Sequence, residues 1–386
     1  MKTIQDYCND VYDNAVRIRR TIHRHPEIGM DCPETTNFIC TELERIGIPY
    51  RKTGTSGVIA EIKGTKGESD EVVMLRADMD ALRTQEKTGL PFASEIEGRM
   101  HACGHDMHTA MLMGSAEILK SMQSEFAGTV RLVFQPGEEI SKGAEYMITH
   151  GAMENVKMGL GIHMDPLSPV HTVSCKPGPD WAAVDHFLIR IHGTGAHGAT
   201  PQNGCDATVA AAAMVMSLQT MVSRECDPMK PLVVTVGSMH SGNAYNIISE
   251  EATLEGTCRS FDEDVYEMIP EAMERIVKYI AEGYKCHAEL ELDRLSKPLY
   301  NDQAAYDALH ESALKVMDEK NWKYAKQEMI GEDFAFFGHY APCVFAHLGC
   351  DGGYPLHNNH VNFHEEAMKT GMALEVQFAL DTLKKQ

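Results

Sequence analysis

The sequence predicts a mixed α/β protein built from two domains. The chain has 386 residues, whereas a single hydrophobic core seldom grows beyond about 250–300 residues. In its first part, helical and strand-like segments alternate, which is typical of a largely parallel sheet with covering helices. Between about residues 182 and 295 the order changes to β-α-β-β-α-β, which is that of a ferredoxin-like split unit. The remaining residues return to helix and strand, so we expect them to re-enter the first domain.

Apolar spacing and β-rich runs define the elements of the first domain. Gly47 follows the second helical segment and marks a position where a helix can end. The expected elements, in chain order, are a helix at 4–22, a helix at 34–46, strands at 58–62 and 72–75, a helix at 108–122 and a strand at 128–134.

The inserted unit is defined by the same patterns. Its expected elements are a strand at 186–191, an alanine- and methionine-rich helix at 206–222, strands at 232–236 and 252–258, a helix at 264–281 and a strand at 286–292. We therefore place the first domain at residues 1–181 and 296–386 and the inserted domain at residues 182–295.

The composition excludes several classes of partner. Asp and Glu total 56 against 35 Lys and Arg, a formal net charge of −21, so nucleic acid and anionic membrane surfaces would be repelled. The chain contains no run of about 18 apolar residues that would predict a membrane span, and its first residues lack a signal-peptide pattern. Its eleven scattered cysteines indicate reduced thiols, so a cytoplasmic location is expected.

Two apolar strands run directly into paired carboxylates. The segment LRADMDAL (75–82) contains Asp78 and Asp80, and VRLVFQPGEE (130–139) ends in Glu138 and Glu139. Strand ends are where open α/β sheets place ligand chemistry. One carboxylate of such a pair can bind a metal while its neighbour takes a proton from metal-bound water. A solvated turn and a surface Glu-Glu pair are the alternatives, although the Pro-Gly turn after a buried strand argues against the second.

A third segment, HACGHDMH (101–108), concentrates metal-ligating side chains just before a predicted helix. Thiolate and neutral imidazole are good ligands for zinc and related metals. Cys103 and His105, with Gly104 between them, can converge on one point. Two weaker signals are His163, which follows an apolar run, and His357 in YPLH. All these clusters fall outside the inserted unit, at element ends that one sheet edge could bring together.

Together these motifs resemble the M20 metallopeptidase clan, and within it the amidohydrolase branch of hippurate hydrolases, indole-acetyl–amino acid hydrolases, N-acetyl-diaminopimelate deacetylases and bacterial aminoacylases. The resemblance extends from His23 to Phe363 and rests on LRADMDAL, HACGHDMH, FQPGEE, GIHM, GAHGATPQNGCD and PLH-x5-F. It implies a metallopeptidase-type catalytic domain (1–181 and 296–386) and an inserted lid and dimerisation domain (182–295).

The resemblance also implies two divalent metal ions per chain, Mn²⁺ or Zn²⁺, bridged by Cys103. One ion would be held by Cys103, Glu139 and His357. The other would be held by Cys103, His105 and His163.

Further roles follow from the same resemblance. Glu138 matches the general base, and Asp80 matches the carboxylate that orients a metal-binding group. The wider clan's His-x-Asp motif reads Asp78-Met-Asp80 here, so its first histidine ligand is missing and His105 takes over that role. His101 and His108 are expected to support the site or the fold without binding metal. His360 and His364 are expected to be surface or rim groups, and no partner of His23 or His25 is visible in the sequence.

Three residues of the inserted unit match positions that act on the substrate. His197, in the glycine-rich segment GTGAHGATP (193–201), is expected to donate to the oxyanion, in its own subunit or in a neighbouring one; a loop histidine bonded to backbone is the alternative. Arg259 and Asn246 are candidates for binding the substrate carboxylate. An ion pair of Arg259 with an acid such as Asp262 is the alternative reading for that arginine.

The predicted function is hydrolysis of the amide bond of small N-acyl amino acids to a carboxylic acid and an amino acid. Glu138 would act as the general base on a metal-bound water. A homodimer formed through the lid is expected. The alternatives are a dipeptidase or carboxypeptidase of the same clan and a non-catalytic metal-binding protein, against which the Glu138–Glu139 pair argues.

Overall fold

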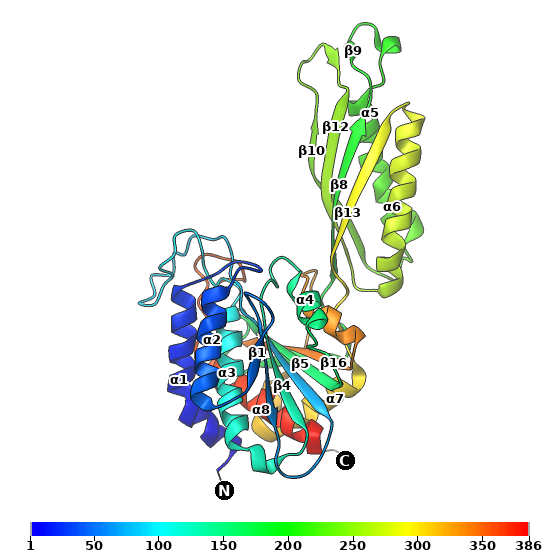
Figure 1. Cartoon of the computed structure of the whole chain (residues 1–386). Coiled ribbons are helices and arrows are strands. Elements are labelled where there is room, and N and C mark those ends of the chain that lie inside the picture. The colour runs from blue at the N-terminus through cyan, green and yellow to red at the C-terminus, as the bar shows by residue number, and fades with distance from the viewer. Residues whose placement is uncertain (1, 385–386) are drawn as a thin grey trace. The chain divides into compact units, whose positions relative to one another are not determined.

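The computed structural model describes residues 2–384, which fold into two compact units (Figure 1). Unit 1 comprises the described residues up to Gly178, residues 300–326 and those from Asp333 onward, whereas unit 2 comprises residues 179–299 and 327–332. The sequence prediction placed residues 327–332 in the first domain, which is wrong. This returning segment pairs with unit 2 through backbone bonds such as Ala182 N–H to Ile330 O at 2.8 Å, which no sequence pattern reveals.

Unit 1 is built on a mixed eight-stranded sheet with the order β1-β2-β4-β3-β5-β16-β6-β15. Its centre, β4-β3-β5-β16, is parallel throughout, as the alternation of helices and strands predicted. The strands are β1 (Tyr50–Lys52), β2 (Val58–Lys63), β3 (Val72–Asp78), β4 (Thr129–Gln135), β5 (Val156–Asp165), β6 (Val173–Cys175), β15 (Trp322–Tyr324) and β16 (Cys343–Gly349), with a separate short pair β7 (Gly178–Pro179) and β14 (Tyr300–Asn301).

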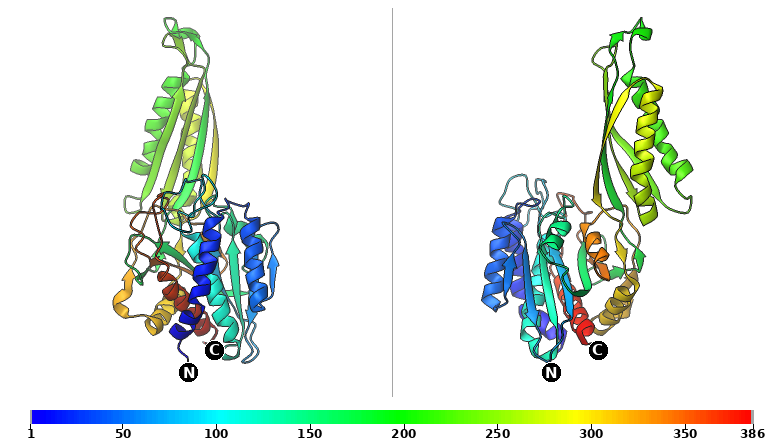
Figure 2. Two further views of the ribbon diagram at one scale, coloured as in Figure 1. Left: turned by 90° about the vertical axis from the view of Figure 1, so that its left-hand side faces the viewer. Right: turned by 45° about the vertical axis from the view of Figure 1, so that its right-hand side comes forward.

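Helices cover this sheet (Figure 2). They are α1 (Ile4–Arg24), α2 (Pro33–Ile46), α3 (His105–Ser121), α4 (Gly143–Thr149), α7 (Gln303–Val316) and α8 (Ala367–Lys384), with short 3₁₀ segments η1 (Gln123–Glu125), η4 (Glu319–Asn321) and η5 (Asp333–His339). The helices α1, α3 and α8 pack together, and α4 packs against η5. Side chains alternate along a strand, so Val73, Leu75 and Ala77 of β3 enter the main core while Arg76 between them reaches Asp333 of η5.

Local sequence explains where these helices begin and end. At the start of α1, Thr3 and Asp6 form a reciprocal capping box, which satisfies two backbone donors. Gly47 ends α2 with φ of 69°, in the left-handed region where glycine costs least. The third helix begins at His105, three residues before the predicted start, so the candidate ligand His105 is part of a helix rather than of a loop.

Unit 2 has the predicted ferredoxin-like order. Its four-stranded sheet runs β10-β12-β8-β13, antiparallel throughout, with α5 and α6 packed against it around a separate core. The elements are β8 (Ala183–His192), β9 (Ala196–His197), a 3₁₀ segment η2 (Pro201–Asn203), α5 (Ala207–Thr220), a π-helical turn η3 (Met221–Glu225), β10 (Leu232–Ser241), β11 (Ile247–Ile248), β12 (Glu251–Ser260), α6 (Glu263–Gly283) and β13 (His287–Ser296). In the part of the chain that the structure describes, none of the helices is both long and apolar enough to span a membrane.

Candidate metal centre

The parallel centre of the unit 1 sheet gathers the candidate residues at one edge. Asp78 is the last residue of β3, and Asp80 follows two positions later. Glu138 and Glu139 follow β4 after the Pro-Gly turn. His163 lies near the end of β5. Since parallel strands end at the same edge of a sheet, these side chains converge although they come from distant parts of the sequence.

Two of the groups of ligand atoms at this edge share Cys103. In the first, the ligand atoms of Cys103, His105 and His163 lie within 4.8 Å of one another. In the second, those of Cys103, Glu139 and His357 do so as well. Cys103 Sγ is 3.4 Å from His163 Nε2, and His357 Nε2 is 3.5 Å from Glu139 Oε2. The structure thus brings together all five residues that the sequence nominated as ligands, in two sets that share the cysteine.

Hydrogen bonds at Nδ1 orient the rings of two candidate histidine ligands. His105 Nδ1 lies 2.8 Å from Asp80 O, and His163 Nδ1 lies 2.8 Å from Met164 O. A carbonyl oxygen only accepts, so each Nδ1 carries a proton, and Nε2 is the nitrogen that each ring would present to a metal ion in its neutral form. His105 Nε2 and Glu139 Oε1 are buried without a hydrogen-bond partner. Such orphaned atoms beside a thiol suit a metal ion, because buried polar groups are otherwise paired.

Backbone conformation fixes two further positions. Gly104, between Cys103 and His105, has φ of 91°, and a Cβ there would meet Met164 and Phe363 at 3.1–3.2 Å. His357 has φ of 65°, a costly conformation for a residue other than glycine. Its N–H donates to Ala102 O at 2.9 Å, which ties the His357 loop directly to the Cys103 segment.

Asp80 joins the loops around the centre. Its carboxylate accepts the backbone N–H of Glu138 at 3.0 Å and of Glu139 at 3.2 Å, while its own carbonyl accepts from His105. The predicted orienting residue therefore contacts three candidate site residues. Its carboxylate holds the paired glutamates, and its backbone orients the imidazole.

The electrostatics of the centre favour positive charge. Burial opposes the charged form of His105, but the neighbouring carboxylates, Asp78 first, raise its pKa to about 10. Burial raises the pKa of Glu139 to about 7, with a further contribution from Asp80. Burial, followed by Glu139 and Glu138, also raises the pKa of the Cys103 thiol well above its usual range. A bound cation reverses this balance, since a coordinating thiol loses its proton.

A third group, formed by Asp78, His105 and His108, also has its ligand atoms close together, but it is a hydrogen-bond network. His108 Nδ1 donates to Asp78 Oδ1 at 2.5 Å, and His108 Nε2 accepts the N–H of Met164 at 2.9 Å. Both nitrogens of His108 are occupied by protein groups. The expectation that His108 supports the site without binding metal agrees with these contacts.

The substrate-binding candidates lie in unit 2. His197 in β9 pairs with Ile247 in β11, and Asn246 O accepts the N–H of Gly198 at 2.8 Å, so His197 and Asn246 are neighbours. Arg259 lies near the far end of β12, where its Nη1 donates to Met329 O at 3.4 Å. The alternative partner named for Arg259, Asp262, binds Lys230 instead.

Several residues around the centre were not singled out from the sequence. Arg76, Gln135 and Asp333 hydrogen-bond to one another beneath the paired carboxylates, and no motif marks Asp333. The sequence shows no partner for His23 at the end of α1, and in the structure its Nδ1 lies 2.9 Å from Asp106. Contacts across 83 residues of sequence, as in this pair, are set only by folding.

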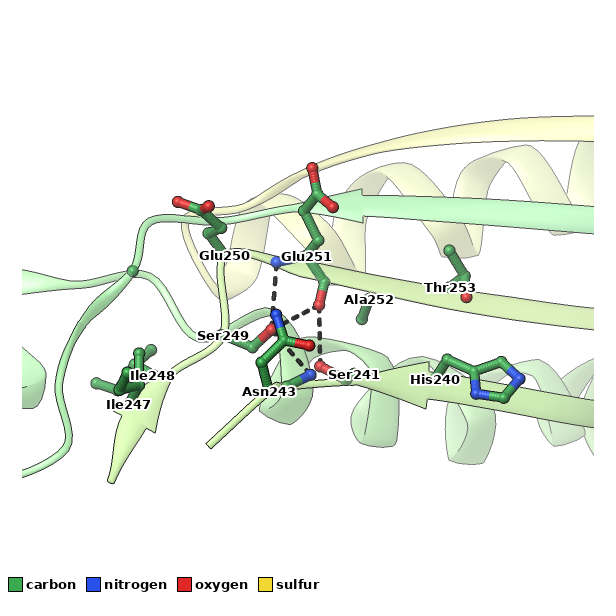
Figure 3. A pocket seen from close by; sticks show the side chains of 12 residues that line it. His240, Ser241, Asn243, Ile247, Ile248, Ser249, Glu250, Glu251, Ala252 and Thr253 are labelled. Atoms are coloured by element: carbon green, nitrogen blue, oxygen red, sulfur yellow. Dashed lines mark hydrogen bonds between the residues drawn. The ribbon is translucent and has the colours of Figure 1, made fainter. Parts of the chain in front are cut away.

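Unit 2 also contains a pocket of its own, with a volume of about 580 Å³ (Figure 3). It is lined by β10, β11 and the start of β12, where Ser249 Oγ donates to Glu251 O at 2.7 Å and accepts the N–H of Gly242. None of the candidate metal ligands lines this pocket.

Comparisons with known proteins agree with the fold and the motifs. Residues 74–381 match the model of peptidase family M20/M25/M40. An N-acetyl-L-cysteine deacetylase and an N-acetylcysteine deacetylase of Bacillus subtilis (strain 168) are 39% and 37% identical, covering 92% and 97% of this chain and 84% and 98% of their own lengths. A hippurate hydrolase of Campylobacter jejuni is 34% identical, covering 97% of this chain and 98% of its own length.

A solved structure from Bacillus subtilis, a dinuclear metal-binding peptidase of the M20 family, superposes with a TM-score of 0.86 at 34% identity. The match covers 98% of this chain and 100% of that one. The chain therefore belongs to peptidase family M20/M25/M40, and within it to the amidohydrolase branch. It is a hydrolytic enzyme, as the sequence predicted.

Proposed function

We propose that this enzyme hydrolyses the amide bond of N-acyl amino acids at a dinuclear metal centre in unit 1. The observation that carries the proposal is the pair of ligand groups that share Cys103. The relatives named for N-acetylcysteine and hippurate act on N-acylated amino acids by those names, and one solved relative is described as dinuclear. These names support the substrate class, and the geometry supports a metal-assisted hydrolysis.

We assign one ion to Cys103, Glu139 and His357 and the other to Cys103, His105 and His163. The orphaned Nε2 of His105 and Oε1 of Glu139 support this assignment. The donor set combines a thiolate, which favours zinc, with carboxylate and imidazole, which also suit manganese. Zn²⁺ and Mn²⁺ are therefore the two ions to test.

When bound, two divalent ions would polarise the substrate carbonyl and lower the pKa of the attacking water. Glu138 is the general base in this proposal: it takes a proton from that water and then delivers it to the leaving amine. Its carboxylate lies 3.8 Å from His105 Nε2, and its backbone is held by Asp80. A protein that only stored metal would have no use for a second carboxylate beside Glu139.

His197 is proposed as the donor to the oxyanion. Its Nδ1 accepts the N–H of Ala199 at 3.0 Å, so the neutral ring carries its proton on Nε2, which is the group that a developing oxyanion needs. The backbone contact expected for an ordinary loop histidine is present, yet it sets the tautomer that suits a donor. Asn246, its neighbour, and Arg259 are the candidates for the substrate carboxylate.

We also propose a homodimer formed through unit 2. Strand β10 lies at the edge of its sheet and has a register shift between Val236 and Ser238. Its residues 232–241 include no charged Lys, Arg, Asp or Glu and no proline, which are two of the features that block edge pairing. The adjacent helix α5 exposes Val209 and Met216, and β10 exposes Val233 and Met239. Such exposed apolar side chains beside an open edge favour a second copy as the partner.

A cytoplasmic location completes the proposal. The eleven cysteines form no disulfide, which favours a reducing compartment.

A hydrolysis panel tests the reaction. Enzyme loaded with Mn²⁺ or Zn²⁺ is given N-acetylcysteine, hippurate and other N-acyl amino acids, and separately dipeptides with a free amino group. We expect kcat/KM to be highest among the N-acyl amino acids. Preference for dipeptides would instead assign a dipeptidase or carboxypeptidase. Metal binding without hydrolysis of any member of the panel would contradict the proposed reaction.

A further inference from the structure

A buried arginine connects three elements beneath the candidate metal centre. Arg76 of β3 is only 3% exposed. Its Nε donates to Gln135 Oε1 at 2.8 Å, its Nη1 to Asp78 Oδ2 at 2.7 Å and its Nη2 to Asp333 Oδ1 at 2.9 Å. These partners belong to β4, β3 and η5. Because the guanidinium is a rigid planar fork, three such bonds fix the partners relative to one another.

One branch of this network holds the loop of the paired glutamates at both ends. Gln135, the last residue of β4, donates from Nε2 to both oxygens of Asp333 at 2.8 and 2.9 Å. Ala144, in the first turn of α4, donates its N–H to Asp333 Oδ2 at 2.9 Å. The loop between these two residues carries Glu138 and Glu139. Both of its flanks are thus bound to one carboxylate, which Arg76 holds in turn.

The other branch leads to a candidate metal ligand. Asp78 accepts from His108 Nδ1, and His108 Nε2 accepts the N–H of Met164. The carbonyl of that same Met164 accepts from His163 Nδ1 at 2.8 Å. A continuous series of hydrogen bonds therefore runs from Arg76 to the imidazole of His163.

Charge makes Arg76 essential to both branches. The side chains of Asp78 and Asp333 are fully buried, and Arg76 lies between them as a cation bonded to both. Removing the guanidinium would deprive two buried carboxylates of the cation that pairs with both, which is strongly unfavourable. Asp78 Oδ2 is also 3.6 Å from His105 Nε2, and its bond to Arg76 keeps this oxygen engaged as a hydrogen-bond acceptor.

We propose that Arg76 is a positioning residue for the dinuclear centre. It holds the Glu138–Glu139 loop and the His163 segment at the separation that two metal ions require. This role rests on the metal centre proposed above, and Arg76 itself contacts neither metal nor substrate in it.

Metal affinity of Arg76→Met tests this role, with Arg131→Met as the matched control. Arg131 is also a buried arginine of this sheet, at the other end of β4, where it binds Glu61 and the carbonyls of residues 151, 152 and 154. Each variant is loaded with Zn²⁺ or Mn²⁺, dialysed against graded chelator and analysed for bound metal, and the melting temperature of the metal-free protein is recorded.

We expect both variants to melt at a lower temperature than the wild type. Only Arg76→Met should also lose metal affinity, by about 10–100-fold, which is the usual effect of removing a residue that orients ligands. Arg76→Lys, which keeps the charge but not the planar fork, should fall between Arg76→Met and the wild type. If Arg76→Met does not fold, the metal affinity of Arg76→Lys relative to the wild type is the test of the positioning role.

Unchanged metal affinity in a folded Arg76 variant, or an equal loss in Arg131→Met, overturns the positioning role while the metal centre stands. A wild-type chain that binds no metal contradicts the proposed function instead, and this role with it.

Discussion

Most candidate residues of unit 1 are buried, with His357 as an exposed exception, whereas those of unit 2 are exposed or partly buried. In unit 1, His105, Asp78 and Asp80 are fully buried, and His163 is 2% exposed. In unit 2, His197 and Asn246 lie on exposed short strands and turns. Groups that bind metal need a fixed geometry, which packing and hydrogen bonds supply. Groups that contact a substrate must remain accessible and can sit on surface segments carried by a rigid sheet.

This contrast predicts different failures for the two units. Substitutions in unit 1 should change metal binding or the proton transfer itself. Substitutions in unit 2 should leave the metal in place and change how the substrate is handled.

The largest effect is expected at Glu138 in unit 1. Glu138→Gln keeps the size of the side chain but cannot accept the proton of the attacking water, so kcat should fall about 10²–10⁴-fold. Bound metal, measured by elemental analysis, should match the wild type because Glu139 and its partners are intact. Near-normal kcat would remove Glu138 from the role of base.

A somewhat smaller effect is expected at His197 in unit 2. His197→Ala should bind both metals, fold normally and lose roughly 10²–10³ in kcat, the scale of one oxyanion donor. Mixing His197→Ala with Glu138→Gln subunits then tests the origin of the donor. A donor from the neighbouring subunit restores partial activity in the mixed dimer, whereas confirmed subunit exchange without recovery excludes that arrangement.

Recognition of the substrate carboxylate should have a more modest effect. Asn246 precedes β12 and Arg259 lies near the far end of that strand, so we expect one of them to bind the carboxylate. Of Asn246→Ala and Arg259→Ala, the variant with the larger rise in KM identifies that residue. Each variant is compared on an N-acyl amino acid and on its C-terminal amide, with kcat and KM determined separately. Equal kcat/KM of the wild type for acid and amide would show that no carboxylate is recognised.

The smallest effect concerns stability and lies away from the centre. Burial raises the pKa of Glu375 in α8 from 4.5 to about 8, although Ser115 donates to it at 2.5 Å and opposes the shift. The folded state therefore keeps the proton that the unfolded state loses. The resulting stabilisation is complete below about pH 4.5 and is lost as pH rises through 8.

Glu375→Gln removes this pH dependence. Its melting temperature relative to wild type should rise between pH 5 and pH 8, because only the wild type loses stability over that range. Glu145→Gln, at an exposed position of α4, controls for the change in net charge. A difference that is the same at both pH values would mean that Glu375 is ionised in the fold.

Much of the fold could be predicted because its periodic signals are local. Neighbouring residues alone account for the capping of α1, for the apolar spacing of the helices and for the strand order of unit 2. Boundaries were less accurate: the helix predicted from residue 108 begins at His105, and residues 327–332 return to unit 2. Those differences arise from a glycine turn and from backbone pairing with distant residues.

For the candidate site, the sequence by itself determined the chemistry, since the clustered thiol, imidazoles and carboxylates already specify a metal centre. It also indicated that the clusters lie at element ends that one sheet edge could bring together. Only the tertiary structure decided how they are held. The tautomers of His105 and His163, the left-handed backbone of His357 and the network of Arg76 with Asp333 depend on contacts between distant segments. Those contacts form only when burial forces each polar group to find a partner.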